Sequence, residues 1–273
     1  MGAIDYNKGI SLRNNTKLSS VIYHENEFNK AQNQMKVSLF IPCLTEHLFP
    51  DSGLSMVKVF KKLGVEVKYV ENQTCCGQPA FNTGYHKQTV PVAEHFIELF
   101  RDEEYIVAPS GSCVSMVREH YEDLPLRSNL IEPYRALKKR IFEFTEFLVD
   151  VLGVEDIGGS FPHKVTYHDS CHVARALGIR EQPRKLIRAI RDIDFVEMEK
   201  SDTCCGFGGT FSYKWKDISL EMVQRKCRYI DESRAEFCIG ADSSCLMNIN
   251  GYLKKNKFRA RTMHIANLLA QSI

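Results

Sequence analysis

The sequence predicts an α/β fold built from two pseudo-symmetric halves, each with its own parallel sheet. Two observations support this prediction. Strand-like and helix-like segments alternate along the chain, and the pattern of the first half returns in the second. The chain has 273 residues, enough for two domains of roughly 100–200 residues each. We expect a flexible N-terminal extension at 1–34, a first repeat at 35–155 and a second repeat at 156–273.

The repeat is defined by cysteines. Each half has a single cysteine, then an adjacent pair followed by glycine, then another single cysteine. Equivalent cysteines are separated by offsets of 128, 129 and 132 positions, and small insertions explain the drift. The eight residues are Cys43, Cys75, Cys76, Cys113, Cys171, Cys204, Cys205 and Cys245.

The first half has an apolar run for a buried strand, followed by a helix that Asp51 is expected to cap and Gly64 to end. A segment of alternating hydrophobicity then predicts a second strand before the Cys-Cys-Gly turn. The expected elements are strands at 37–42, 65–70 and 105–108, with helices at 51–63, 86–100 and 131–152.

The second half repeats this order and adds a short strand and a helix at its end. The expected elements are strands at 164–168, 193–197, 236–240 and 259–262, with helices at 182–191, 214–232, from Cys245 onward, and at 264–271. Alternating strands and helices predict Rossmann-like halves with right-handed crossovers. Ligands of such sheets bind beyond the carboxyl ends of the strands. Every repeated cysteine follows a strand, so we expect four loops of each half to converge.

Four convergent thiolates are soft ligands that favour zinc or an iron–sulfur cluster. Adjacent cysteines diverge and would strain one tetrahedral ion, whereas a cluster spreads its iron atoms over more space. The spacing therefore favours iron–sulfur and leaves zinc as the alternative. Gly77 and Gly206 would permit positive φ and close approach of a cluster to the backbone. Asp242 and His168 are weaker candidate ligands, and His172 a candidate for tuning a cluster or relaying protons.

Other residues have simpler interpretations. Cys227 and Cys238 have no counterpart in the first half, and we expect them to be buried packing residues. Lys and Arg number 36 against 34 Asp and Glu, so charge does not indicate nucleic acid binding. No apolar run of about 18 residues predicts a transmembrane helix, and no signal peptide is recognised. We therefore expect a cytoplasmic protein with reduced thiols.

The double Cys-Cys-Gly arrangement resembles the cysteine-rich (CCG) domain family, which includes the cysteine-rich component of heterodisulfide reductase and the iron–sulfur component of glycolate oxidase. The similarity runs from about 36 to 271. It implies an iron–sulfur electron-transfer subunit of a cytoplasmic complex that oxidises L-lactate to pyruvate with partner subunits. The stretches that carry it are 75–80 (CCGQPA), 110–113 (SGSC), 202–211 (DTCCGFGGTF), 239–245 (IGADSSC) and 263–266 (MHIA).

One departure from the family pattern affects the expected cofactor. The fuller motif ends each repeat in C-x-x-C, but Ser110 and Asp242 stand at the first of those positions. With four cysteines per repeat, we expect an ordinary [4Fe–4S] cluster in each half. Two alternatives stay open: an enzyme like heterodisulfide reductase that acts directly at a cluster, and a zinc-stabilised scaffold. The sequence has no flavin or nicotinamide fingerprint, so hydride chemistry would fall to a partner.

Overall fold

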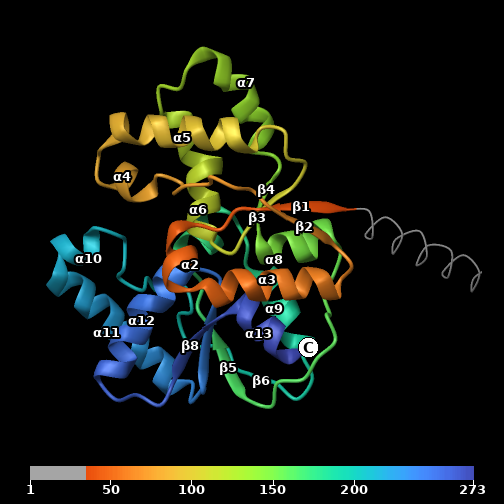
Figure 1. Cartoon of the computed structure of the whole chain (residues 1–273). Helices are drawn as coiled ribbons and strands as arrows, with labels where there is room; N and C mark the ends of the chain where they lie inside the picture. The colour runs from red at the N-terminus through yellow and green to blue at the C-terminus, as the bar shows by residue number, and fades with distance from the viewer. Residues whose placement is uncertain (1–34) are drawn as a thin grey trace, which may run out of the picture.

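The computed structural model describes residues 35–273, which form two halves around two four-stranded parallel sheets (Figure 1). The predicted fold class is therefore confirmed. The first sheet has the order β2-β1-β3-β4 and the second has the equivalent order β6-β5-β7-β8. The strands, in chain order, are β1 (Lys36–Leu39), β2 (Glu66–Tyr69), β3 (Ile106–Ala108), β4 (Ile141–Glu143), β5 (Lys164–Tyr167), β6 (Asp194–Phe195), β7 (Phe237–Gly240) and β8 (Arg261–His264).

The register of the two sheets follows the internal repeat. Leu39 of β1 pairs with Val107 of β3, and at the equivalent place Tyr167 of β5 pairs with Ile239 of β7. The central strands are buried on both faces, as expected where helices cover a parallel sheet. The carboxyl ends of the strands therefore present equivalent loops in both halves.

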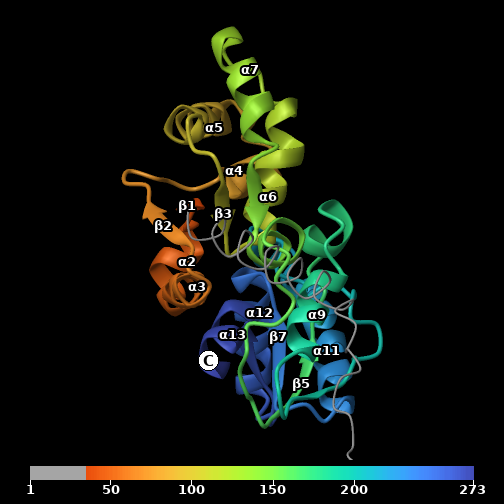
Figure 2. The ribbon, with the colours of Figure 1, turned by 90° about the vertical axis from the view of Figure 1, so that its right-hand side faces the viewer.

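Helices of the first half cover both faces of its sheet. α5 and α7 lie side by side at one end of the molecule (Figures 1 and 2). The helices are α2 (Cys43–Leu48), α3 (Pro50–Lys62), α4 (Gln78–Asn82), α5 (His86–Phe100), α6 (Gly111–Ser115), which continues as a π-helix (Met116–His120) and a 3₁₀ turn (Tyr121–Asp123), α7 (Ser128–Leu137) and α8 (Phe144–Glu146), which continues as a π-helix (Phe147–Val151).

Helices of the second half follow the same plan, and its last helix packs on the first half. α13 lies against α3 (Figure 1), where Lys58 donates to the carbonyl of Ala270. One apolar core runs through both halves at this contact, and each half adds a smaller core of its own. The helices are a π-helix (His172–Ala176), α9 (Glu181–Arg188), α10 (Phe211–Lys214), α11 (Lys216–Glu232), α12 (Ser243–Lys255) and α13 (Ile265–Ser272).

Two predicted elements are wrong. The helix expected at 131–152 is two helices separated by β4, because the chain reverses at the Lys138–Arg140 turn and adds a fourth strand. The helix expected to be capped by Asp51 begins at Pro50, with Asp51 in its first turn. The extension predicted at 1–34 lies outside the described residues, and the boundary between 155 and 156 stays a prediction. Among residues 35–273, no helix has the length and hydrophobicity needed to cross a membrane.

Candidate metal centres

The first set of cysteines comes from three loops at the carboxyl edge of the first sheet. Cys43 begins α2 after β1, Cys75 and Cys76 follow β2, and Cys113 lies in α6 after β3. The Sγ atoms of Cys43 and Cys75 are 3.6 Å apart. Interactions with the thiols of Cys113 and Cys75 raise the pKa of Cys76. The predicted convergence of this quartet is therefore present.

The second set repeats the arrangement. Cys171 follows β5, Cys204 and Cys205 follow β6, and Cys245 lies in α12 after β7. Interactions between neighbouring thiols raise the pKa of Cys171 and Cys205 and lower that of Cys204, so the four sulfurs lie close together. All ten cysteines fall within residues 35–273, and none is in a disulfide. The thiols are thus free to act as ligands.

Each set holds at least one thiol that is ionised at neutral pH. Hydrogen bonds from Cys43 and then Cys76 lower the pKa of Cys75 to about 3. Hydrogen bonds from Cys171 and then Cys205 lower the pKa of Cys204 in the same way. Thiolates, not thiols, bind metals, so each set contains donors already in the ligating form.

The glycine after each cysteine pair donates its backbone N–H to the sulfur whose pKa is lowered. Gly77 has φ +86° and donates its N–H to Cys75 Sγ at 3.4 Å, and Gly206 has φ +80° and donates to Cys204 Sγ at 3.4 Å. A side chain would also be crowded, because a Cβ at Gly206 would lie 2.6 Å from a backbone carbonyl oxygen. The Cys-Cys-Gly sequence is therefore explained by a left-handed turn that only glycine adopts readily.

Both sets of cysteines line one cavity of about 460 Å³ between the halves. Gly111 donates to the carbonyl of Ala241 at 3.4 Å, and Ser110 forms a β-bridge with Asp242. These contacts join the loops that carry Cys113 and Cys245. In each set two cysteines are buried and two are half-buried, so both sets face the same cavity.

Asp242 caps two helices that belong to different halves. One carboxylate oxygen accepts the N–H of Ser112 in α6 at 2.8 Å. The other accepts the N–H of Ser244 at 3.2 Å and its hydroxyl at 2.6 Å, at the start of α12. Both oxygens are engaged in this arrangement, and the assignment of Asp242 as a ligand stays a prediction. Sequence spacing could not reveal the contact with Ser112, because the partners are 130 positions apart.

The structure also brings His168 to the second set. Its ring is 1% exposed, and a ring nitrogen lies within 4.8 Å of the sulfurs of Cys205 and Cys245. A hydrogen bond from Cys205, followed by one from His168, lowers the pKa of Cys245 to about 6 despite burial. Neither ring nitrogen has a hydrogen-bond partner among the described residues. His168 is therefore placed to bind a metal or to donate to sulfur.

A further polar residue at the cavity escaped sequence analysis. Gln78, which follows the first Cys-Cys-Gly turn, donates to the carbonyl of Ser112 at 3.0 Å and lies 3.4 Å from Nε2 of His172. It thus links the two halves at the sulfurs. Its place in the CCGQPA stretch was the only signal. Cys227 and Cys238 are buried among apolar side chains, as predicted.

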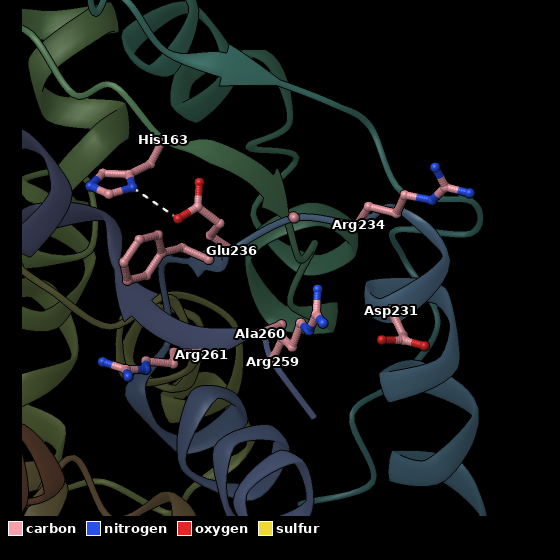
Figure 3. Close-up of a pocket in the computed structure, with 9 residues that line it drawn as sticks. His163, Asp231, Arg234, Glu236, Arg259, Ala260 and Arg261 are labelled. Atoms are coloured by element: carbon pink, nitrogen blue, oxygen red, sulfur yellow. Dashed lines mark hydrogen bonds and ion pairs between the residues drawn. The ribbon is translucent and has the colours of Figure 1, made fainter. Parts of the chain in front are cut away.

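A second cavity, of about 840 Å³, lies beside the amino-terminal ends of β7 and β8, away from the cysteines. His163 and Glu236 pair across its rim at 3.0 Å (Figure 3). Arg234, Arg259 and Arg261 are exposed and point in different directions. This hollow therefore contributes nothing to the thiol centres.

The donor sets fit a thiolate-bound metal or cluster. Each offers four sulfurs, a thiolate, a backbone N–H on that thiolate, and a left-handed glycine that leaves room beside the pair. These are the features by which proteins hold and tune iron–sulfur clusters. A structural zinc also accepts four thiolates, so the donor chemistry alone permits either.

Together, the duplicated sheet and the two thiol sets define a class of protein with two cysteine-rich domains in one chain. A family model described as "Cysteine-rich domain" (CCG) matches the chain twice, at 37–118 and 165–250. A crystal structure of a hypothetical protein from Helicobacter pylori shares the fold, with a TM-score of 0.61 and 13% identity. That match covers 90% of this chain and 53% of the other.

Curated relatives are similar over nearly their whole length. "Lactate utilization protein A" of Oceanobacillus iheyensis is 43% identical over 86% of this chain and 96% of that protein. The protein of the same name from Exiguobacterium is 47% identical, over 87% and 98%. The chain therefore belongs to the cysteine-rich domain family, in the group of proteins named lactate utilization protein A.

Proposed function

We propose that this chain is the iron–sulfur electron-transfer subunit of a cytoplasmic complex that oxidises L-lactate to pyruvate. The observation that carries the proposal is the pair of free four-thiol sets lining one cavity. The names of the relatives supply the substrate, because both are called lactate utilization proteins. We propose one [4Fe–4S] cluster in each set, held by the four cysteines of that half.

The electron count suits two one-electron centres. Oxidation of lactate to pyruvate releases two electrons and two protons. A [4Fe–4S] cluster supplies a one-electron redox centre, so two clusters would take both electrons. The hydride or proton chemistry at lactate belongs to a partner protein in this proposal, and the electrons leave to an acceptor elsewhere in the complex.

The chain's own residues would hold the clusters and limit their contact with water. Buried Cys76, Cys113, Cys205 and Cys245 anchor each set on the protein side, while the other four cysteines are half-buried at the cavity. The N–H groups of the two turn glycines donate to sulfur, which favours the more negative, reduced state. A partner protein would reach the cavity where Tyr213, 90% exposed, stands at its lining.

A zinc-stabilised scaffold is the second candidate, and one distance favours it. The 3.6 Å between Cys43 Sγ and Cys75 Sγ is close to the edge of a zinc tetrathiolate, about 3.8 Å for a Zn–S distance of about 2.3 Å. A cluster would require these sulfurs to move apart. An enzyme acting on a small molecule at a cluster is the third candidate, because the 460 Å³ cavity faces both sets.

Metal analysis of protein purified without oxygen separates these candidates. The proposal expects about eight iron and eight sulfide per chain, with broad visible absorption. Colourless protein with stoichiometric zinc and no sulfide would instead establish the scaffold. A paramagnetic signal of the reduced protein that changes when a thiol or lactate is added would favour direct catalysis, whereas an unchanged signal supports electron transfer.

A further inference from the structure

The two sets differ in the side chains around their sulfurs, although their ligands match. The repeat aligns 37–43 with 165–171, so Phe40 stands where the second half has His168. In the same register Pro42 is replaced by Ser170. One residue beyond the first ligand of each set, Leu44 of the first half corresponds to His172 of the second, at the same offset of 128. Three apolar positions of the first set are therefore polar in the second.

Phe40, which stands at the position of His168, offers the first set no polar group. Phe40 is fully buried and packs edge-on against Phe96, with ring centroids 4.8 Å apart, and against Phe100. Among residues 35–273, the side chains that hydrogen-bond to the sulfurs of the first set are other cysteines. The first set therefore receives side-chain donors from its own thiols alone.

The polar members of the second half face the sulfurs. Neither ring nitrogen of His168 has a hydrogen-bond partner among the described residues, and one of them lies within 4.8 Å of the sulfurs of Cys205 and Cys245. A buried N–H without an acceptor is costly, so its proton is directed to that sulfur group. Ser170 adds a hydroxyl 3.8 Å from Cys245 Sγ.

His172 supplies another donor, and its tautomer follows from its neighbour. The side-chain nitrogen of Gln78 only donates, so Nε2 of His172, 3.4 Å away, is the acceptor. The proton of the neutral ring is therefore on Nδ1, which lies 3.7 Å from Cys171 Sγ. That N–H therefore faces the sulfur of Cys171 in the second set.

Two carboxylates lie near these donors. The charge of Asp242 raises the pKa of Cys171 and Cys245 and so acts against the donors, but its two oxygens accept the N–H groups of Ser112 and Ser244, which offset part of that charge. Asp169 is buried beside His168, but Arg184 binds both of its oxygens at 2.9 and 2.8 Å, and Ser201 donates to it at 2.7 Å. Lys226, fully buried, donates to the carbonyl of Ser201 at 2.8 Å. Arg184 and Ser201 thus neutralise the negative charge of Asp169. The second set therefore still has more side-chain N–H groups near its sulfurs than the first set.

We propose that the second set holds the centre of higher reduction potential, because His172 donates to a sulfur and the unpartnered ring of His168 lies beside two more, where the first set has Leu44 and Phe40. Hydrogen bonds to sulfur stabilise the reduced cluster and raise its potential. Electrons then enter at the first set and collect at the second. This inference rests on the proposed clusters and gives the relay a direction.

The test is a redox titration of the full chain followed by paramagnetic resonance, on the wild type, His168→Phe and His168→Gln. His168→Phe installs the residue of the first half, whereas His168→Gln keeps an N–H donor. We expect two transitions in the wild type, of which only the higher one moves down in His168→Phe. A tenfold loss of reduced second centre at fixed potential corresponds to about 59 mV for one electron. His168→Gln should retain most of the higher potential, and His172→Leu should shift the same transition.

Each outcome decides the inference. A downward shift confined to the higher transition supports it. A shift of the lower transition would reverse the assignment, and unchanged potentials in both His168→Phe and His172→Leu would remove the basis for it. Iron lost from one centre in both His168 variants would make His168 a ligand and also overturn it. Wild-type protein without iron and sulfide would instead refute the proposed function itself.

Discussion

Asp242 is a buried side chain that joins the two halves directly. It is 2% exposed, and its two oxygens accept hydrogen bonds from α6 of one half and α12 of the other. Each of these helices carries a cysteine of one thiol set, Cys113 or Cys245. Asp242→Ala should therefore destabilise the fold and loosen both thiol sets together, although the residue lies in the second half.

The magnitude follows from the bonds that are lost. Hydrogen bonds to a charged group contribute roughly 1.5–3 kcal/mol, and a buried donor left unpaired costs about 1–3 kcal/mol. Loss of an N-cap costs about 0.5–2 kcal/mol. Because these contributions overlap, we expect Asp242→Ala to lower the free energy of unfolding by about 3–5 kcal/mol. Asp242→Asn should lose about half of that, since its amide can accept from only one of the two helices.

The assay is urea denaturation of the metal-free chain, together with iron analysis of the anaerobic protein. Asp102→Ala is the matched control, because Asp102 is 88% exposed and should change stability by less than about 0.5 kcal/mol. Iron should fall in both centres of Asp242→Ala. Unchanged stability with iron lost from the second centre alone would refute the reasoning and make Asp242 an oxygen ligand.

Three further experiments test the fold around the site. Gly84→Ala, at φ +88° with open space around it, should cost about 1–2 kcal/mol of stability. Gly206→Ala should cost about 1–3 kcal/mol more, because the added Cβ meets a backbone carbonyl oxygen. Thermal denaturation compares the two variants, and equal losses of stability would contradict crowding at Gly206. Burial raises the pKa of Glu143 from 4.5 to about 7, so the folded chain keeps a proton that the unfolded chain releases. Stability should therefore fall by about 3 kcal/mol between pH 4.5 and 7, and Glu143→Gln should abolish this fall in denaturation curves. Arg184→Met should cost about 3–5 kcal/mol because it leaves the charge of Asp169 buried, and adding Asp169→Ile should recover most of the loss if the missing partner is its cause.

The alternation of strands and helices and the cysteine register were enough to predict the class of fold. Parallel strands bring their carboxyl ends to one edge, so cysteines placed after strands must approach one another. The same rule failed to reveal β4, because the apolar residues on both sides of Ile141–Glu143 continue a helical spacing. The repeat itself held the missing signal, since β8 was expected at the equivalent place in the second half.

Contacts between the halves could not be predicted from the sequence. The hydrogen bond from Ser112 to Asp242 joins residues 130 positions apart, and the approach of Gln78 to His172 spans 94. Such contacts depend on how two sheets are placed relative to each other, which no local spacing encodes. For the same reason, the sequence predicted two separate centres, whereas the structure gives both sets one cavity.

Duplication creates two sites that begin identical, and identical sites would have equal potentials and no preferred direction of transfer. The ligands and turn glycines of this chain are still identical, because any change there would cost a sulfur or strain the turn. Divergence falls instead on positions near the cysteines, such as Phe40, which belongs to the same apolar cluster as Cys76 and Cys113, and His168. A polar residue at such a position in the second half needs buried partners, and the Asp169–Arg184 pair beside it shows that the surroundings changed with it. The asymmetry therefore lies in the residues next to the ligands, where it can separate the two potentials while both sets keep their four thiols.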